Sequence, residues 1–350
     1  MLTEHFLPTP ATDMGSCKRQ LSHGSRSFYF ASHLLPSVMQ QAACGLYAFC
    51  READDLIDEG SDPRAALDEL HGRLDRIYEE KPLYLSTDRV LTQIVHSYQL
   101  PRALLDALLE GFEWDASGRS YRDIDAVYDY SARVAGAVGV MMSVLMGVRD
   151  APTLARAADL GTAMQLTNIA RDVGEDARLG RIYLPLDELV ANGIEPEAFL
   201  RNPSFTPELG RTIEQLLQRA RALYIRADSG ISGLPRKYQP GIRAARKLYS
   251  AIGDQVAIQG YNSVDSRAVV GTNKKLGLLL SAITLRQPRE LASNEPALTQ
   301  NQFLIDAVVN APADAPAVTN NMFKPRALWM LDLFETLHAR DRNPGIARHR

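Results

Sequence analysis

The chain has 350 residues, of which 45% are hydrophobic, enough for one large domain or two ordinary ones with a sizeable core. Its formal net charge of −3 gives no sign of the basic surface that nucleic-acid binding requires. The three cysteines, Cys17, Cys44 and Cys50, lack the spacing of a metal site and indicate a reducing compartment without structural disulfides. The N-terminus lacks the pattern of a signal peptide, so we expect a cytoplasmic protein.

Residues 1–15 contain two prolines and no periodic pattern, which predicts a mobile N-terminal tail. After it, Ser25, Arg26 and Ser27 follow Gly24 in the segment S-H-G-S-R-S-F. Their side chains could hydrogen-bond a phosphate, with the arginine supplying a charged fork. The capped start of a helix has a similar pattern, so this segment alone leaves both interpretations open.

A strong helical pattern over residues 36–59 carries the first acidic segment. Tyr47, Arg51, Asp54 and Asp58 are spaced 4, 3 and 4 residues apart, which places them on one helical face. Carboxylates this close together repel one another unless a positive charge compensates them. A solvated surface helix could tolerate the repulsion, but a bound cation is the better explanation if a second such segment exists.

An apolar helix is predicted over residues 123–147. Small residues at 135, 136, 137 and 139 leave room on its surface, which either close helix packing or a bulky apolar ligand would explain. Tyr130 lies one turn before this part of the helix, where its hydroxyl could reach the mouth of a cavity. The longest uncharged stretch, residues 134–148, is shorter than the roughly 20 residues of a membrane-spanning helix.

The second acidic segment lies on a helix predicted over residues 152–175, in the stretch Q-L-T-N-I-A-R-D-V-G-E-D. Gln165, Asn168, Asp172 and Asp176 form one polar stripe, and the opposite face is apolar. Carboxylate and amide oxygens suit a hard cation such as Mg²⁺ or Mn²⁺. A solvated polar face is the alternative that this segment leaves open.

Residues 291–326 are rich in Pro, Ala and Asn, which predicts a linker. Beyond it, residues 327–340 could form an amphipathic helix, and the basic tail to residue 350 could contact an anionic membrane surface. The remaining helices are predicted at 64–80, 88–113 with an interruption near Pro101, 186–200, 207–230 with Thr206 as the N-cap, 238–262 and 274–286.

No strand alternation, fixed repeat or nucleotide-binding glycine motif occurs in the sequence, so the pattern favours an all-α fold. Two facing helices that carry carboxylates could hold metal ions that make a diphosphate a leaving group. Arg51, Arg171 and Arg181 could stabilise the departing diphosphate. Because loss of a diphosphate leaves a carbocation, the site needs a dry apolar pocket. This chemistry indicates an isoprenoid enzyme whose acidic helices cap an apolar shaft.

Five motifs occur in order: S-R-S-F, Y-x-x-C-R-x-x-D-D-x-x-D, Y-x-x-x-V-A-G-x-V-G, Q-L-x-N-I-x-R-D-x-x-x-D and R-I-Y-L-P. Together they resemble the squalene/phytoene synthase family of head-to-head prenyl transferases, over roughly residues 16–290. The segments G-S-R-S-F, M-G-V-R-D and Q-L-T-N-I-A-R-D are most similar in sequence to those of bacterial phytoene synthases. The resemblance implies a single large isoprenoid-synthase helical bundle around a central apolar cavity.

The resemblance also implies that two geranylgeranyl diphosphates are joined through prephytoene diphosphate to phytoene, the first committed step of carotenoid biosynthesis. It implies Mg²⁺ or Mn²⁺ as cofactor without NADPH, and a phytoene desaturase and the inner membrane surface as partners. Squalene or dehydrosqualene synthesis from farnesyl diphosphate is the alternative within the family. A non-catalytic helical relative should have lost some of these aspartates and arginines. A head-to-tail prenyl transferase or terpene cyclase should lack S-R-S-F and V-A-G-x-V-G.

Residue roles follow from the same resemblance. Metal ligands are expected at Asp54, Asp58, Asn168, Asp172 and Asp176, of which the four aspartates, Tyr130 and Arg171 are the expected catalytic residues. Substrate-binding positions are expected at Ser25, Arg26, Ser27, Tyr47, Arg51, Gln165, Arg171, Arg181 and Tyr249. Some relatives have a histidine directly before S-[KR]-S-F, where this chain has Gly24, so a role for the neighbouring His23 is in doubt.

Overall fold

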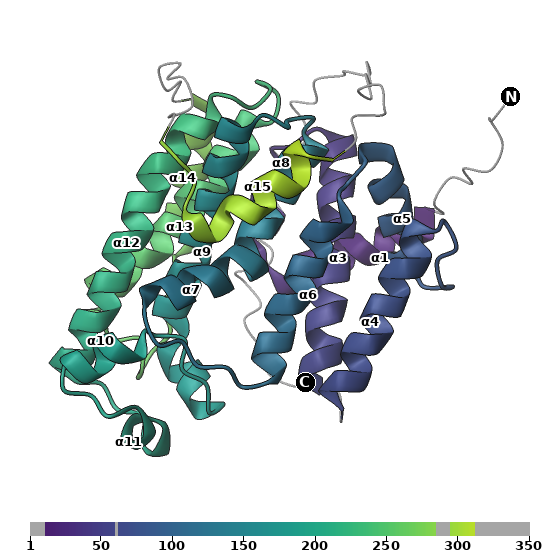
Figure 1. Ribbon diagram of the computed structural model, residues 1–350. Coiled ribbons are helices and arrows are strands. Elements are labelled where there is room, and N and C mark those ends of the chain that lie inside the picture. The colour runs from purple at the N-terminus through teal and green to yellow at the C-terminus, as the bar shows by residue number, and fades with distance from the viewer. Residues whose placement is uncertain (1–10, 60–61, 285–294, 312–350) are drawn as a thin grey trace, which may run out of the picture.

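The computed structural model describes residues 11–59, 62–284 and 295–311, and every regular element in these ranges is helical (Figure 1). The all-α fold predicted from the sequence is confirmed. The first half contains α1 (Ala11–Gly24), α2 (Arg26–Ser32), α3 (Ser37–Glu59), α4 (Pro63–Tyr78), α5 (Ser86–Tyr98) and α6 (Arg102–Ala116). The second half contains α7 (Ile124–Ser131), a π-helical turn (Ala132–Gly136), α8 (Ala137–Leu145), α9 (Ala151–Arg178), α10 (Leu186–Ala191), α11 (Pro196–Arg201), α12 (Pro207–Ile231), α13 (Gln239–Ile258), α14 (Thr272–Thr284), a 3₁₀ turn (Thr299–Asn301) and α15 (Gln302–Val309).

Helix α9, with 28 residues, is the centre of the bundle and contacts α7, α8, α12, α13 and α15. Its first turn is fixed by Asp150, whose side chain accepts a hydrogen bond from the Thr153 amide, and by Pro152. Its end is marked by Gly180, which has a φ of 77°. Because α9 has neighbours on several sides, it presents one end of its polar stripe to the interior of the protein.

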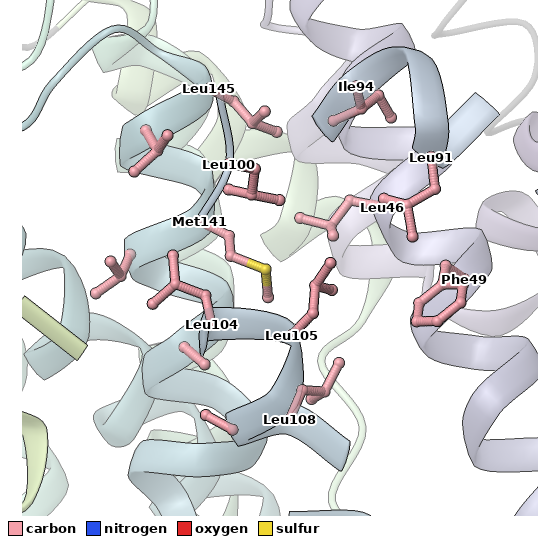
Figure 2. Close-up of a cluster of buried hydrophobic side chains, with 14 of the residues drawn as sticks. Leu46, Phe49, Leu91, Ile94, Leu100, Leu104, Leu105, Leu108, Met141 and Leu145 are labelled. Carbon is pink, nitrogen blue, oxygen red and sulfur yellow. The ribbon is translucent and has the colours of Figure 1, made fainter. Parts of the chain in front are cut away.

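The hydrophobic core consists of two clusters. The first is built from α1, α3–α6 and α8, and Figure 2 shows Leu46 of α3, Leu105 of α6 and Met141 of α8 meeting in it. The second is built mainly from α7, α9, α12 and α13. Phe28 and Val134 pack against both clusters. Truncation of a fully buried leucine such as Leu105 costs about 2–5 kcal/mol in typical cores, so the two clusters hold the bundle around the space between them.

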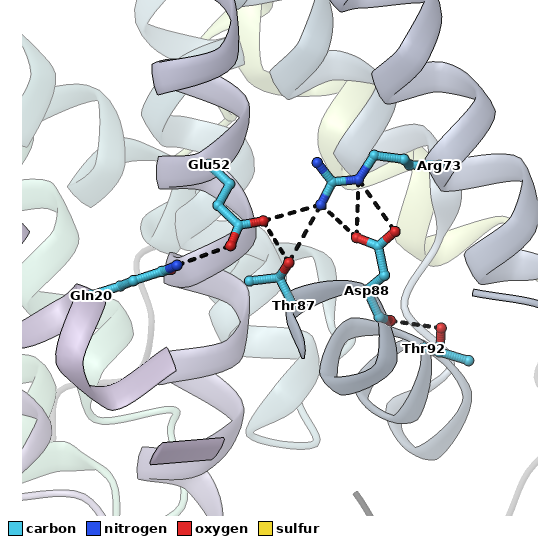
Figure 3. A network of polar contacts seen from close by, with 6 residues as sticks. All are labelled: Gln20, Glu52, Arg73, Thr87, Asp88 and Thr92. Atoms are coloured by element: carbon cyan, nitrogen blue, oxygen red, sulfur yellow. Dashed lines mark hydrogen bonds and ion pairs between the residues drawn. The ribbon is translucent and has the colours of Figure 1, made fainter. Parts of the chain in front are cut away.

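A buried polar network joins the first four long helices of the chain (Figure 3). Arg73 of α4 donates from Nε to Asp88 of α5 at 3.0 Å, and from Nη2 to Glu52 of α3 at 3.1 Å. Glu52 also accepts from Thr87 and from Gln20 of α1. The Asp88 side chain is fully buried and the Arg73 side chain is 5% exposed, so each charge depends on its partner in the other helix.

Two expectations about the ends of the chain are wrong. The predicted tail over residues 1–15 is helical from Ala11 onward, because Asp13 is buried and accepts hydrogen bonds from Ser86 and Arg89 of α5. The predicted linker over residues 291–326 contains α15, which packs on α6, α8 and α9 (Figure 1). The helix predicted at 327–340 and the basic tail lie outside the described residues.

Most helix predictions from the sequence hold, with two differences. The helix expected at 123–147 is divided by the π-helical turn, and the one expected at 186–200 is two short helices, α10 and α11. The interruption near Pro101 is confirmed, since Gln99 ends α5 with a φ of 47°. Thr206 is confirmed as the N-cap of α12, where its hydroxyl accepts from the Leu209 amide. Within the described ranges, no helix is long and apolar enough to cross a membrane.

Candidate active site

A cavity of about 450 Å³ lies between the two core clusters. One end is polar and is lined by Arg51, Asp54, Asp115, Gln165 and Asn168. The rest of the wall is mostly apolar and reaches a far end lined by Met142, Met146, Ile231, Leu234 and Ile242. The predicted central apolar cavity is therefore present. Its carboxylates, with Arg51, lie at one end, which we call the mouth, while Arg156, Thr153 and Ser143 also line the wall.

The first acidic segment reaches the mouth from helix α3. Arg51 donates from Nη1 to Asp54 at 2.8 Å and from Nε to Asp55 at 3.1 Å. Tyr47, one turn earlier, also lines the cavity, and burial raises the pKa of its hydroxyl to about 12. That hydroxyl is therefore a neutral donor at physiological pH. The side chain of Asp58 lies outside the described part of this helix.

Gly24 explains one departure from the family pattern. A Cβ atom at this position would lie 2.1 Å from the Tyr47 hydroxyl oxygen, far inside van der Waals contact. The glycine therefore gives Tyr47 the space that a larger residue would take. Ser25, the next residue, is the N-cap of α2 and accepts from the Phe28 amide at 3.3 Å, so the helix-cap interpretation of this segment is realised. Arg26 and Ser27 lie in the first turn of α2, and their side chains are not among those described.

The second acidic segment reaches the mouth from helix α9. Gln165 and Asn168 line the cavity, and the Asn168 amide donates to Gln165 at 3.4 Å. Asp172 accepts from the Nε of Arg171 at 2.7 Å and from the Nε of Arg267 at 2.8 Å. Burial, together with the neighbouring charge of Asp172, raises the pKa of Asp176 to about 7. The stripe predicted from the sequence thus combines one well-paired carboxylate with one whose charge is incompletely compensated.

Arg267 is a residue of the site that sequence reasoning missed. It lies 95 positions after Asp172, in a segment without a recognisable motif. Its loop packs directly on α9, where the Gly174 amide donates to Ser263 at 3.0 Å. A Cβ at Gly174 would lie 2.3 Å from the Val264 carbonyl oxygen, so only a glycine permits this approach. The G in R-D-V-G-E-D was the one signal that a second backbone lies against this turn.

Asp115, at the end of α6, is a second residue that the sequence did not single out. Its carboxylate accepts hydrogen bonds from the hydroxyls of Tyr130 and Tyr183, both at 2.8 Å. Burial raises the pKa of Asp115 to about 6, although the two tyrosine hydrogen bonds and the charge of Arg181 act in the opposite direction. Tyr130 and Tyr183 are stacked with their ring centroids 5.2 Å apart. The predicted cavity tyrosine, Tyr130, is thus held by a half-buried carboxylate.

The acidic groups of three helices lie close enough to shift the pKa values of one another. The charge of Asp54 on α3 raises the pKa of Asp115, and the charge of Asp115 raises the pKa of Asp176 on α9. Arg181, in the link after α9, lowers the pKa of both Asp115 and Asp176 and therefore lies close to them. Tyr249 of α13 lines the same cavity, with its ring centroid 5.1 Å from that of Phe28.

The donor set at the mouth fits a divalent metal ion in its chemistry. Asp54, Asp172 and Asp176 offer carboxylate oxygens and Asn168 offers its amide oxygen, and hard cations prefer such oxygen ligands. The raised pKa of Asp176 means that a nearby positive charge would favour its ionised form. Among the described side chains, however, no three His, Cys, Asp or Glu residues are already grouped as a metal site. Since two arginines pair with Asp172, these ligands would have to rearrange to bind a metal.

A helical bundle whose carboxylates and arginines stand at one end of a deep apolar cavity defines the class of all-α isoprenoid synthases. Residues 21–274 match the squalene/phytoene synthase family, and the chain belongs to this family. Both the fold class and the family expected from the sequence are confirmed. The enzyme is therefore a prenyltransferase of the type found in this family.

Its similarity to curated phytoene synthases extends over most of the chain. The phytoene synthase of Rhodobacter capsulatus is 45% identical over 346 residues, which cover 96% of this chain and 98% of the relative. That of Cereibacter sphaeroides is 48% identical over 276 residues, or 76% and 78% of the two chains. Among solved structures, a dehydrosqualene synthase in complex with ligand has a TM-score of 0.73 and 30% identity, covering 78% of this chain and 96% of that one. Enzymes of this family process prenyl diphosphates and generally use divalent metal ions.

Proposed function

We propose that the protein joins two geranylgeranyl diphosphates head to head, through prephytoene diphosphate, to give phytoene, two diphosphates and a proton. The observation that carries this proposal is the union of facing carboxylates and arginines with one deep apolar cavity, in a chain 45% identical to a phytoene synthase over nearly its whole length. The diphosphate ends of the substrates lie at the mouth, and the prenyl chains extend toward the apolar far end.

Divalent metal ions, Mg²⁺ or Mn²⁺, neutralise the diphosphate and make it a better leaving group. Asp54, Asp58, Asn168, Asp172 and Asp176 are the residues that would hold them. Their positions on α3 and α9 support this assignment, because both helices direct oxygen atoms to the same mouth. Binding of cations there would also offset the mutual repulsion that raises the pKa of Asp176.

Arginines around the mouth bind the diphosphate. Arg51 lines the cavity directly, and Arg181 lies near Asp115 and Asp176. Arg171 and Arg267 now pair with Asp172 and can redirect their donors to phosphate oxygens when that carboxylate binds a metal. Ser25, Arg26, Ser27, Tyr47, Gln165 and Tyr249 complete the set of substrate-binding residues that we propose.

Ionisation of the diphosphate leaves an allylic cation, which water would destroy. The largely apolar wall of the cavity excludes water from the reacting carbons. Tyr130, whose pKa burial raises well above its ordinary value, remains a neutral hydroxyl beside this region. Asp115 accepts a hydrogen bond from this hydroxyl and thereby orients the hydroxyl oxygen toward the cavity. No NADPH is consumed in this reaction.

Squalene or dehydrosqualene synthesis from farnesyl diphosphate is the second candidate. Its support is the 30% identity and TM-score of 0.73 to a dehydrosqualene synthase, whose chain is covered almost completely. The two candidates share the mouth and differ in the length of the prenyl chains that the cavity accepts. Length selection depends on the apolar wall and not on the diphosphate-binding groups.

One experiment separates the candidates. The purified full-length protein is incubated with Mg²⁺ or Mn²⁺ and either geranylgeranyl or farnesyl diphosphate, with and without NADPH, and the hydrocarbon is identified by mass spectrometry. The proposal predicts phytoene from geranylgeranyl diphosphate, independent of NADPH and abolished by a chelator. Exclusive formation of a thirty-carbon product from farnesyl diphosphate would overturn it in favour of the second candidate.

The product is too apolar to diffuse through water, so we place the enzyme in the cytoplasm at the inner membrane surface, near a phytoene desaturase that receives the product. Co-sedimentation of the full-length protein with anionic and with neutral vesicles tests the membrane contact. Binding that requires anionic lipid and weakens with salt supports it. Equal absence from both vesicle pellets contradicts it.

A further inference from the structure

The segment 295–309 lies beyond the residues that match the family, yet it packs against the wall of the cavity. Leu304, Ile305 and Val308 of α15 are buried against the helices that they cross. In Figure 1, α15 lies across the part of the bundle formed by α8 and α9. This part of the chain is therefore a structural layer of the cavity.

The segment is anchored at its start by buried charges. The Pro296 carbonyl oxygen accepts hydrogen bonds from Arg226 at 2.7 Å and from Arg156 at 3.3 Å. Both arginines also pair with Asp159, whose side chain is fully buried. Arg156 itself lines the cavity, so a backbone atom of the segment contacts a residue of the cavity wall.

A second contact lies where the π-helical turn crosses α9. The Gly161 position is so close to this turn that a Cβ there would lie 2.1 Å from the Ala135 carbonyl oxygen. Ala135 and Gly161 both line the cavity. The crossing is thus one wall of the substrate space, made of backbone and very small side chains. π-helical turns often occur at functional sites, where the extra residue displaces the backbone locally.

Asn301, which is not among the residues that line the cavity, supports this crossing. The residue is fully buried. Its side-chain Oδ1 and Nδ2 atoms each lie 3.4 Å from the Thr162 hydroxyl oxygen on α9. On the π-helical turn, a Cβ built on Gly136 would lie 3.1 Å from the Asn301 oxygen. Thr162 and Gly136 are the immediate neighbours of Gly161 and Ala135, the two residues that face the cavity.

We propose that Asn301 is a positioning residue that fixes the spacing of the π-helical turn and α9, and thereby sets the selectivity of the cavity between prenyl chains of different length. The inference rests on the proposed function, because it concerns the same cavity and the same substrates. Within the described part of the chain, Asn301 contacts Thr162 and the Gly136 position rather than residues of the mouth, so its effect should fall on the apolar chain. A wall that can shift by a few tenths of an ångström changes the fit of methylene and methyl groups along it.

The test compares kcat/KM for geranylgeranyl diphosphate with kcat/KM for farnesyl diphosphate in the full-length enzyme. Since one methylene group in an apolar pocket changes selectivity about 10-fold or more, we expect Asn301→Ala to reduce the ratio about fivefold to tenfold. Thr162→Val removes the hydroxyl with little change of volume and should reduce the ratio in the same direction. Gln302→Ala is the matched control, because its side chain is exposed and donates a hydrogen bond to Asp306 on the surface of α15.

A compensating variant distinguishes positioning from a general loss of stability. Gly136→Ala in the Asn301→Ala background adds a methyl group where the amide has been removed, and should restore the ratio to within about twofold of the wild-type value. Equal losses of kcat/KM for both diphosphates, with an unchanged ratio and no rescue, would overturn the inference. If Asn301→Ala does not fold, Thr162→Val decides the question alone. Absence of product from the wild-type enzyme with both diphosphates would instead refute the proposed function.

Discussion

Helix α3 presents acidic side chains to two different environments. Glu52 faces the bundle, where Arg73, Thr87 and Gln20 donate hydrogen bonds to its carboxylate (Figure 3). Asp54, two residues later, lines the mouth of the cavity and accepts from Arg51 of its own helix. The charges around Glu52 pair with partners from other helices and stabilise the fold. Those at the mouth leave oxygen atoms directed into a space that a ligand can enter.

The two regions also differ in how completely burial is compensated. In the buried network, burial also raises the pKa of Asp88, but the Nε and Nη2 hydrogen bonds from Arg73 act in the opposite direction. At the mouth, burial raises the pKa of Asp115 to about 6 and that of Asp176 to about 7, because the nearby positive charge does not offset desolvation and like-charge repulsion. Carboxylates whose pKa values are raised this far favour a nearby cation, whereas Asp88 already has the Arg73 guanidinium beside it. Mutations at the mouth should therefore lower activity and leave the free energy of unfolding nearly unchanged. Mutations in the buried network should lower the free energy of unfolding and leave activity nearly unchanged.

The largest effect is expected from Asp172→Ala at the mouth. Loss of this carboxylate removes a proposed metal ligand and the acceptor of Arg171 and Arg267. We expect turnover of geranylgeranyl diphosphate to fall about 10³-fold or more, as when a principal electrostatic group of an active site is removed. Circular dichroism should show an unchanged helical fold. Wild-type turnover in this variant would show that the site has been placed wrongly.

In the buried network, Asp88→Ala should affect stability instead. The substitution leaves the Arg73 guanidinium, whose side chain is only 5% exposed, without its main partner. Removal of one member of a buried ion pair costs about 3–5 kcal/mol, which chemical denaturation can measure as a lower free energy of unfolding. Activity per folded molecule should remain near that of the wild type. A loss below about 1 kcal/mol would mean that water reaches Arg73 and that the network is not a structural one.

Asp115→Asn tests a residue of the mouth that is half-buried and hydrogen-bonded to two tyrosines. The amide oxygen can still accept one hydrogen bond, but the amide nitrogen cannot accept the second, so Tyr130 or Tyr183 loses its anchor. We expect activity to fall about 10²-fold, the size of effect that misplacement of a site group by about 1 Å produces. Tyr183→Phe serves as the matched variant, because it removes one of the same two hydrogen bonds and leaves the carboxylate. A normal rate in both variants would show that Tyr130 needs no support from Asp115.

Much of the fold could be predicted from the sequence, because long amphipathic patterns and cap residues such as Thr206 act locally. The helix that carries Asn168, Asp172 and Asp176 was predicted for this reason. The partners of this helix could not be predicted in the same way. Contacts such as that between Arg267 and Asp172 join residues 95 positions apart and follow from packing alone. Gly174, which permits that contact, could be interpreted only once the opposing backbone was known.

The errors in the prediction have the same physical origin. The composition of residues 291–326 is typical of a linker, but Leu304, Ile305 and Val308 of α15 find an apolar surface on distant helices. Asp13 appeared to belong to a tail because its partners, Ser86 and Arg89, lie more than seventy residues away. In each case a short segment without a strong periodic signal is ordered by long-range contacts, which sequence composition does not record.

The smallest effect is expected at the contact of Asp13 with Ser86 and Arg89, which stabilises the fold and depends on pH. The hydrogen bonds and charge of Arg89, with Ser86, lower the pKa of Asp13 below its ordinary value of 3.8. Because the folded-state pKa is the lower one, the contact stabilises the protein fully above about pH 4 and loses its contribution as the pH falls through the folded-state value. Asp13→Asn should therefore lower the free energy of unfolding by about 1–3 kcal/mol at neutral pH, the typical worth of hydrogen bonds to a charged group. Denaturation at a series of pH values should show the difference from wild type constant between pH 6 and 8 and shrinking below about pH 4. A difference that grows toward acid pH would mean that Asp13 is protonated more readily in the folded protein than in the unfolded chain.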